Sequence, residues 1–199
     1  MTVNTAKTSN VNIRKIAMTG VLAAIATVLM FLHFQLPFMP SFISLDFSEL
    51  PALIAAFTLG PVSGVAVCFV KNLVLLSQTI TGGVGELSNF IIGSAFVVPA
   101  GLIYRARKTR RGALFACILA SAVMALCSVP VNYFITYPIY SRFMPIEQIV
   151  AAYDAIFPTG RGLLGCLIIF NMPFTFAKGL LCSALTFLVY KRLSGLIKG

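Results

Sequence analysis

The sequence predicts an all-α integral membrane protein with six transmembrane helices and both termini in the cytoplasm. Hydrophobic residues make up 59% of the 199 positions and charged residues only 10%, a balance that leaves too few polar groups to cover a soluble domain. The apolar residues form runs separated by short polar segments, and several runs approach the roughly 20 residues that a helix needs to cross a bilayer. Basic residues lie at the ends of these runs.

The expected helices follow from these runs. Residues 1–13 are expected to form a polar cytoplasmic tail and residues 14–199 a single membrane domain, whose first helix covers about residues 14–33. A loop follows, since Pro37 and Pro40 disfavour helix. The second run, residues 48–70, contains Gly60-Pro61, a pair expected to break or kink it. A short third helix is expected over residues 71–81, and the others over residues 87–104, 112–134 and 162–190.

The charge distribution fixes the orientation of this bundle. With six crossings, the lysines and arginines at positions 7, 14, 15, 105–111, 191, 192 and 198 all fall on one face. Positive residues mark the cytoplasmic side. All five acidic residues fall on the opposite face. The chain lacks Trp, so Tyr133, Tyr137, Tyr140 and Tyr153 are expected to anchor the bundle at the outer interface.

Several classes of function are disfavoured. The formal charge of +10 is explained by topology better than by nucleic-acid binding, because the basic residues flank apolar segments. The five cysteines lie within apolar runs without CxxC pairs and are expected to be neither disulfides nor metal ligands. A single histidine, His33, and no recognisable catalytic set argue against an enzyme. Without a glycine-rich nucleotide loop the chain cannot be the motor of a pump, and no cofactor is expected.

Lys178 is the strongest candidate for a functional residue. It precedes Lys191 by about 20 Å of helix, which places it well inside the membrane. It is expected either to donate a hydrogen bond to a ligand or to form an ion pair with Asp46, Glu49 or Glu86. Asn171 and Thr175 share its helix face, beside Pro173, which frees a backbone carbonyl. These two residues either line a pocket or bond to neighbouring helices.

Further polar and aromatic candidates lie near the outer ends of the helices. Asn89 and Asn132 offer a donor and an acceptor each, which suits a neutral heterocycle or a sugar chain, or else they cap their helices. The loop contains Phe38, Met39, Phe42, Leu45 and Phe47, which form either a lid over a flat ligand or a cap on the bundle.

Two other segments have structural explanations. Asp46-Phe-Ser48-Glu49-Leu-Pro51 has the chemistry of a helix N-terminus. Gly20 and Ala24 lie on a small-residue face of the first helix, which packs either against another subunit or within the bundle.

Five segments together resemble one known family. They are Asp46-Phe-Ser-Glu-Leu-Pro-Ala-Leu-Ile54, Lys71-Asn72-Leu, Gly85-Glu-Leu-Ser-Asn-Phe90, Pro130-Val-Asn-Tyr-Phe134 and Pro173-Phe-Thr-Phe-Ala-Lys-Gly179. The chain resembles the riboflavin-specific substrate-binding (S) components of energy-coupling factor (ECF) transporters. The resemblance implies a six-helix subunit in the plasma membrane of a prokaryote. Such a subunit captures riboflavin from outside and works with a transmembrane coupling protein and two cytoplasmic ATPases.

The resemblance also implies roles for particular residues. Gly20 and Ala24 would dock on the coupling protein, and the first outer loop with helices four to six would form the flavin pocket. The family often has Asn where this chain has Thr175, a departure that affects one ligand hydrogen bond. The expected ligand-binding set is Phe42, Leu45, Asp46, Phe47, Glu86, Asn89, Asn132, Asn171, Thr175 and Lys178.

The alternatives are an S component for another vitamin, a stand-alone membrane carrier or channel, and a membrane-embedded lipid enzyme.

Overall fold

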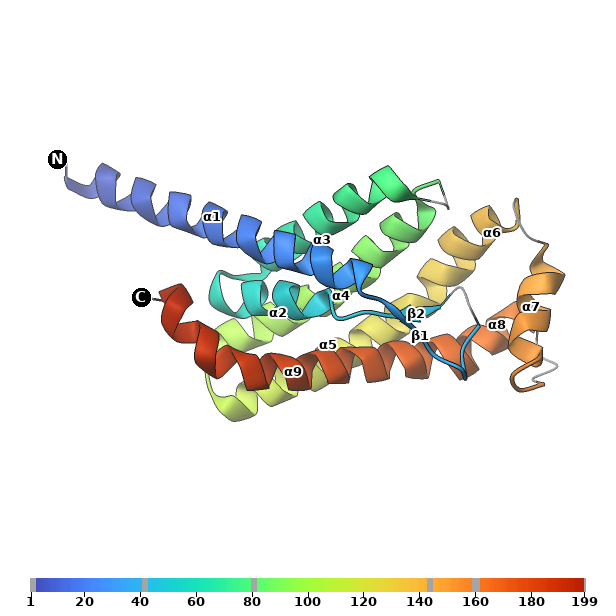
Figure 1. Ribbon diagram of the computed structural model, residues 1–199. Coiled ribbons are helices and arrows are strands. Elements are labelled where there is room, and N and C mark those ends of the chain that lie inside the picture. Colours follow the sequence, from blue (N-terminus) through green and yellow to red (C-terminus); the bar gives the residue numbers. More distant parts are fainter. Residues whose placement is uncertain (1–2, 41–42, 80–81, 143–144, 159–161, 199) are drawn as a thin grey trace.

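The computed structural model is a helical bundle with one short hairpin (Figure 1). It describes residues 3–40, 43–79, 82–142, 145–158 and 162–198, and within these ranges the side chains from residue 13 to residue 189. All the long elements are helices that run back and forth along one direction. The predicted all-α class is therefore confirmed.

The first helix leads into the loop predicted from its prolines. Helix α1 (Val3–Phe31) begins before the expected Arg14 and ends close to the expected position. Two-residue strands β1 (Phe34–Gln35) and β2 (Ser44–Leu45) then pair antiparallel, with Phe34 opposite Leu45. This hairpin holds the loop across one end of the bundle (Figure 1).

The break at Gly60-Pro61 is complete, and it changes the second and third helices. Helix α2 (Glu49–Thr58) is short, and helix α3 (Pro61–Leu75) starts anew with Pro61 in its first turn. Gly60 has a φ of 106°, a conformation that glycine adopts without the cost of a side chain. The predicted break at Gly60-Pro61 is therefore confirmed. The expected helix boundary between residues 70 and 71 was wrong, because α3 continues through Lys71 to Leu75. In the described part of the chain after α3, a single 3-10 turn, η1 (Leu76–Gln78), follows.

The next two helices agree with prediction. Helix α4 (Val84–Ala106) and helix α5 (Arg110–Val131) are joined by a tight turn, in which the Thr109 side chain accepts a hydrogen bond from the Gly112 backbone at 3.0 Å. This is the usual way to satisfy a backbone donor in the first turn of a helix. Helix α5 continues through a π-helical turn, η2 (Asn132–Thr136), into α6 (Tyr137–Tyr140).

The last part of the chain forms a small outer helix and a long final helix. Helix α7 (Ile146–Asp154) lies at the same end as the hairpin (Figure 1). Helix α8 (Gly162–Cys166) then passes through a second π-helical turn, η3 (Leu167–Asn171), into α9 (Met172–Lys198). The expected helix over residues 162–190 is therefore present and carries a local irregularity.

Five helical segments are long and apolar enough to cross a membrane, and α2 is a shorter apolar helix. Helix α2 is nonetheless deeply enclosed, because Ala52, Ala55 and Ala56 are buried. Close approach of α3 depends on Gly64, where an added Cβ would lie 2.9 Å from the Cβ of Ala56. Small residues thus let the short helix sit in the centre of the bundle.

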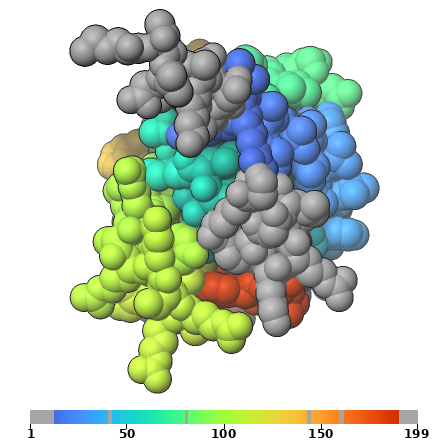
Figure 2. All heavy atoms as spheres, turned by 90° about the vertical axis from the view of Figure 1, so that its left-hand side faces the viewer, coloured from blue at the N-terminus to red at the C-terminus, as the bar shows by residue number. Residues whose placement is uncertain are grey.

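Both chain ends lie at the end of the bundle opposite the hairpin (Figure 1). Figure 2 looks onto this end, where long side chains of the α4–α5 turn project outward. Arg105, Arg107, Lys108, Arg110 and Arg111 of this region are all exposed. The predicted basic cluster therefore lies at the end of the bundle that holds the termini. Two of the five acidic residues, Asp46 and Glu49, are buried and paired with lysines instead of lying on an outer face.

Candidate functional site

A cavity of about 360 Å³ lies below the hairpin, at the end of the bundle away from the termini. Its walls come from the end of α1, the loop, α4, the α5–α6 helix and α9. Six predicted site residues line it: Asp46, Asn89, Asn132, Asn171, Thr175 and Lys178. Residues far apart in the sequence are thus brought to one polar space of ligand size.

The other predicted site residues lie elsewhere. Leu45 lines a separate apolar groove, and Phe47 packs against the central core and against the Phe34 ring, 6.4 Å away. Glu86 lines a small third cavity and accepts a hydrogen bond from Thr79 at 3.0 Å. Phe42 lies outside the described residues. Among the described loop residues, Ile43, Ser44 and Asp46 line the main cavity. Phe38, Met39 and Leu45 line the apolar groove instead.

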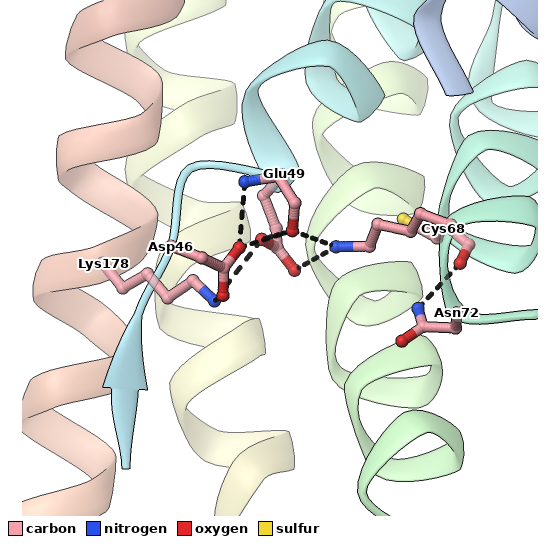
Figure 3. A network of polar contacts seen from close by, with 7 residues as sticks. Asp46, Glu49, Cys68, Asn72 and Lys178 are labelled. Carbon is pink, nitrogen blue, oxygen red and sulfur yellow. Dashed lines mark hydrogen bonds and ion pairs between the residues drawn. The ribbon is translucent and has the colours of Figure 1, made fainter. Parts of the chain in front are cut away.

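The floor of the cavity carries a buried charged network (Figure 3). Lys178 Nζ of α9 lies 2.8 Å from Asp46 Oδ2 and 3.4 Å from Glu49 Oε2. Lys71 Nζ of α3 lies 2.9 Å from Glu49 Oε1 and 2.6 Å from Ser48 Oγ. Two lysines therefore balance two carboxylates. The expected ion pair of Lys178 with Asp46 and Glu49 is confirmed. Lys178 also lines the cavity, and its hydrogen bond to a ligand stays a prediction.

The network explains how the start of α2 is held. Ser48 precedes α2 as expected, but its side chain makes no capping bond to the helix backbone. Its hydroxyl instead contacts Asp46, Glu49 and Lys71. Burial favours the neutral form of Asp46, but the nearby Lys178 and Lys71 outweigh it and hold the pKa of this carboxyl below its usual range. Asp46 therefore stays ionised and ties the loop to α9.

Lys71 is the residue of this network that sequence reasoning missed. Its side chain is 0% exposed. The signal was present, since a lysine within an apolar helix needs a partner. The wrong helix boundary at residue 71 placed it at an interface, where a lysine requires no such explanation.

Three amides present polar groups at different points of the cavity wall. Asn132 Nδ2 donates to the Ser128 backbone oxygen at 2.8 Å, which leaves its Oδ1 as the available acceptor. Asn89 Oδ1 is buried and has no hydrogen-bond partner among the described residues. A buried polar atom without a partner costs about 1–3 kcal/mol. A ligand donor that reached Asn89 would remove that cost.

A chain of hydroxyl groups reaches the third amide. Tyr137 and Tyr153 place their hydroxyl oxygens 2.6 Å apart, and Tyr153 donates to Asn171 Oδ1, also at 2.6 Å. Tyr137 and Tyr153 are buried, so the prediction that they anchor the outer interface was wrong. Burial raises the pKa of the Tyr153 hydroxyl, which therefore remains protonated.

Two of the long helices that border the cavity, α5–α6 and α8–α9, are irregular at this level. In η2 the backbone of Tyr137 donates to Asn132, and in η3 the backbone of Met172 donates to Leu167, each five residues back. Such π turns occur mostly as single bulges inside α-helices, and they are frequent at functional sites. Pro130 and Pro173 lie next to them. Asn132 opens one bulge and Asn171 closes the other.

The arrangement is suited to binding rather than to bond chemistry. No group of three or more His, Cys, Asp or Glu residues able to hold a metal occurs in the part of the chain that the structure describes. The lysine and carboxylates are neutralised by one another. The cavity therefore offers hydrogen-bonding groups that suit a neutral ligand.

The face of α1 that carries Gly20 and Ala24 points away from the bundle. Both residues are exposed, whereas Ala23 and Ala26 of the same helix are buried. An added Cβ at Gly20 meets nothing within 4 Å. Of the two expected uses of this face, contact with another subunit agrees with its exposure.

Comparison with known proteins places this geometry in a class. A family model for the substrate-specific component of ECF transporters matches residues 14–190. The riboflavin transporter RibU of Staphylococcus aureus (strain TCH60) is 32% identical over 93% of each chain. The riboflavin transporter FmnP of Bacillus subtilis (strain 168) is 28% identical over 91% of this chain and 92% of that one.

A solved structure agrees with these sequence relatives. It is described as the S component of a bacterial ECF transporter, and it matches with a TM-score of 0.74 and 31% sequence identity. The match covers 94% of this chain and 99% of that one. The protein is thus a multi-pass transport component of the bacterial plasma membrane, and not an enzyme. It belongs to the family of substrate-specific components of ECF transporters.

Proposed function

We propose that this chain is the riboflavin-binding subunit of an ECF importer. Two relatives that match almost its whole length are named riboflavin transporters. Riboflavin is neutral, and one edge of its flat ring alternates hydrogen-bond acceptors with a donor. Its side chain carries hydroxyl groups. These features fit the cavity, whose volume of about 360 Å³ lies in the range of small-molecule sites, about 300–1,000 Å³.

The single observation that carries this proposal is the convergence of Asn89, Asn132 and Asn171 on one cavity. Amides from three different helices offer both donors and acceptors without net charge. Thr175 adds a hydroxyl on the same wall. A cationic vitamin would instead favour unpaired carboxylates, and Asp46, the carboxylate on this wall, is paired with Lys178.

We also propose that the chain crosses the membrane six times, with both termini in the cytoplasm. Five helical segments are long enough to span, and α2 would supply the sixth, shorter crossing. The exposed basic cluster of the α4–α5 turn lies at the same end as both termini. Positive residues favour the cytoplasmic side. The cavity then opens toward the outside.

Transport would need partners that supply energy, because binding alone does no net work. We propose that Gly20 and Ala24 contact a transmembrane coupling protein, which links the chain to two cytoplasmic ATPases. The exposed small-residue face of α1 supports this assignment. Small residues let another helix approach closely within a membrane.

The first experiment is the absorbance spectrum of the detergent-purified protein. A tightly bound flavin would copurify, and denaturation would release it for identification by mass. A colourless protein that also fails to quench the fluorescence of added riboflavin would refute the riboflavin assignment and leave another vitamin as the substrate. Uptake in cells that lack the coupling protein and ATPases would instead indicate a stand-alone carrier.

A further inference from the structure

We propose that Tyr153, which does not line the cavity, is a positioning residue that orients the Asn171 amide so that its Nδ2 group faces the ligand. The inference rests on the proposed function, since the ligand concerned is riboflavin. It means that ligand binding also depends on Tyr153 of the outer helix α7, although Tyr153 is not among the residues that line the cavity.

The contact is direct and enclosed. Tyr153 O–H donates to Asn171 Oδ1 at 2.6 Å, and the exposed fractions of the two residues are 0% and 7%. An amide has one acceptor and one donor end, and its orientation is set by its hydrogen-bond partners. Oδ1 accepts from Tyr153, and the Tyr137 hydroxyl also interacts with this amide. Nδ2 carries two N–H donors, and we infer that one of them faces the cavity that Asn171 lines.

The direction of the hydroxyl chain is consistent with this orientation. Tyr137 lies 2.6 Å from the Tyr153 hydroxyl oxygen. Because Tyr153 gives its own proton to Asn171, it accepts from Tyr137. The Tyr153 ring is held by Phe170, 5.3 Å away between ring centres, and by Ile149 of its own helix in one apolar cluster. The hydroxyl therefore has little freedom to turn away.

Asn171 needs such an external partner because of its place in the helix. It closes the π turn η3, where the regular hydrogen-bond ladder is interrupted. The irregular backbone of this turn does not by itself hold the Asn171 amide in one orientation. The hydrogen bond from Tyr153 fixes that orientation. The group recognised by Nδ2 must be a hydrogen-bond acceptor, which on riboflavin means a carbonyl oxygen, an unprotonated ring nitrogen or a hydroxyl oxygen of the side chain.

The test compares riboflavin binding by the full-length purified protein and its variants, followed by fluorescence quenching. Tyr153→Phe keeps the ring and removes the hydroxyl, and we expect about 10-fold weaker binding, the equivalent of one ligand hydrogen bond. The matched control is Tyr133→Phe, since Tyr133 is 37% exposed and lies outside the hydroxyl chain. It should bind like the wild type.

A double-mutant cycle separates positioning from general structural damage. In an Asn171→Ala background, Tyr153→Phe should change affinity by less than about two-fold, because the amide through which it acts is gone. A full effect in that background would overturn the proposal. So would unchanged affinity of Tyr153→Phe alone, while the riboflavin assignment would stand. Failure of the wild type to bind riboflavin would overturn both.

A second variant covers the case in which Tyr153→Phe does not fold. Asn171→Asp retains an acceptor for Tyr153 but turns a second acceptor toward the ligand. At about pH 8, far above the ordinary carboxyl pKa of about 4, it should bind riboflavin more weakly than Asn171→Ala. Wild-type affinity of Asn171→Asp would overturn the orientation assigned to the amide.

Discussion

Replacing Lys71 by Met should destabilise the protein strongly, although Lys71 does not line the ligand cavity. The side chain is 0% exposed and lies 2.9 Å from Glu49 Oε1 and 2.6 Å from Ser48 Oγ. In the wild type two lysines balance Asp46 and Glu49. In the variant two buried carboxylates share Lys178 alone.

The expected magnitude follows from the uncompensated charge. Removal of one partner from a buried ion pair typically costs about 3–5 kcal/mol. For a chain of this size each kcal/mol lowers the unfolding temperature by about 2–4 °C, so the shift should be roughly 6–20 °C. Adding Glu49→Gln restores balance between Asp46 and Lys178, and most of the loss should be recovered.

The structure also provides the assay. Cys68, Cys117, Cys166 and Cys182 are free and buried, so a dye that fluoresces on reaction with thiols reports unfolding in detergent. Lys108→Met, at an exposed position, is the control and should change stability by less than about 0.5 kcal/mol. The reasoning would be refuted if Lys71→Met unfolded like Lys108→Met, or if Lys71→Met with Glu49→Gln were no more stable than Lys71→Met alone.

Three further predictions concern other parts of the molecule. Lys178→Ala should weaken riboflavin binding while the protein still inserts into the membrane, and unchanged affinity in a quenching titration would make Lys178 purely structural. Gly20→Leu or Ala24→Leu should spare riboflavin binding but reduce uptake by cells that contain the partner proteins, and normal uptake would remove the proposed docking face. Gly64→Val should cost about 1–3 kcal/mol by overpacking, because its Cβ would lie 2.9 Å from Ala56 and 3.2 Å from Val97. Thermal unfolding should show that loss, whereas Gly20→Ala, with open space around the new Cβ, should not lower stability.

The class of fold and part of the site could be predicted because polar groups within the hydrocarbon layer are costly. That rule identified Lys178, Asn171 and Thr175, and the structure places all three on the cavity wall. It did not decide which acid Lys178 pairs with: Lys178 meets Asp46 and Glu49, whereas Glu86 follows the turn at Gly82–Gly83 and accepts from Thr79. Near a helix end a polar side chain can reach several environments, so its position in the sequence does not fix which one it enters.

The break at Gly60-Pro61 was predicted, but the boundary placed between residues 70 and 71 was wrong. Hydropathy does not drop at Gly60-Pro61, so apolar content alone makes residues 48–70 one run. In the structure this run forms two helices, because Gly60 has a positive φ and Pro61 begins a new helix. The error also concealed Lys71, which became a helix end in the prediction and is a buried interior residue of α3 in the structure.

Tyr153 shows why the rest of the site could not be predicted from sequence. A tyrosine near a membrane interface is expected to place its hydroxyl in water, and nothing in the sequence around Tyr153 distinguishes it from Tyr133. What distinguishes them is the packing of α7 against the π bulge of the last helix, where Tyr153 meets Asn171. That contact needs an irregular turn, a short outer helix and a neighbouring tyrosine to coincide in space. None of these three features is unusual in the sequence. Their contact in the folded protein is what places the Tyr153 hydroxyl where it can orient the Asn171 amide.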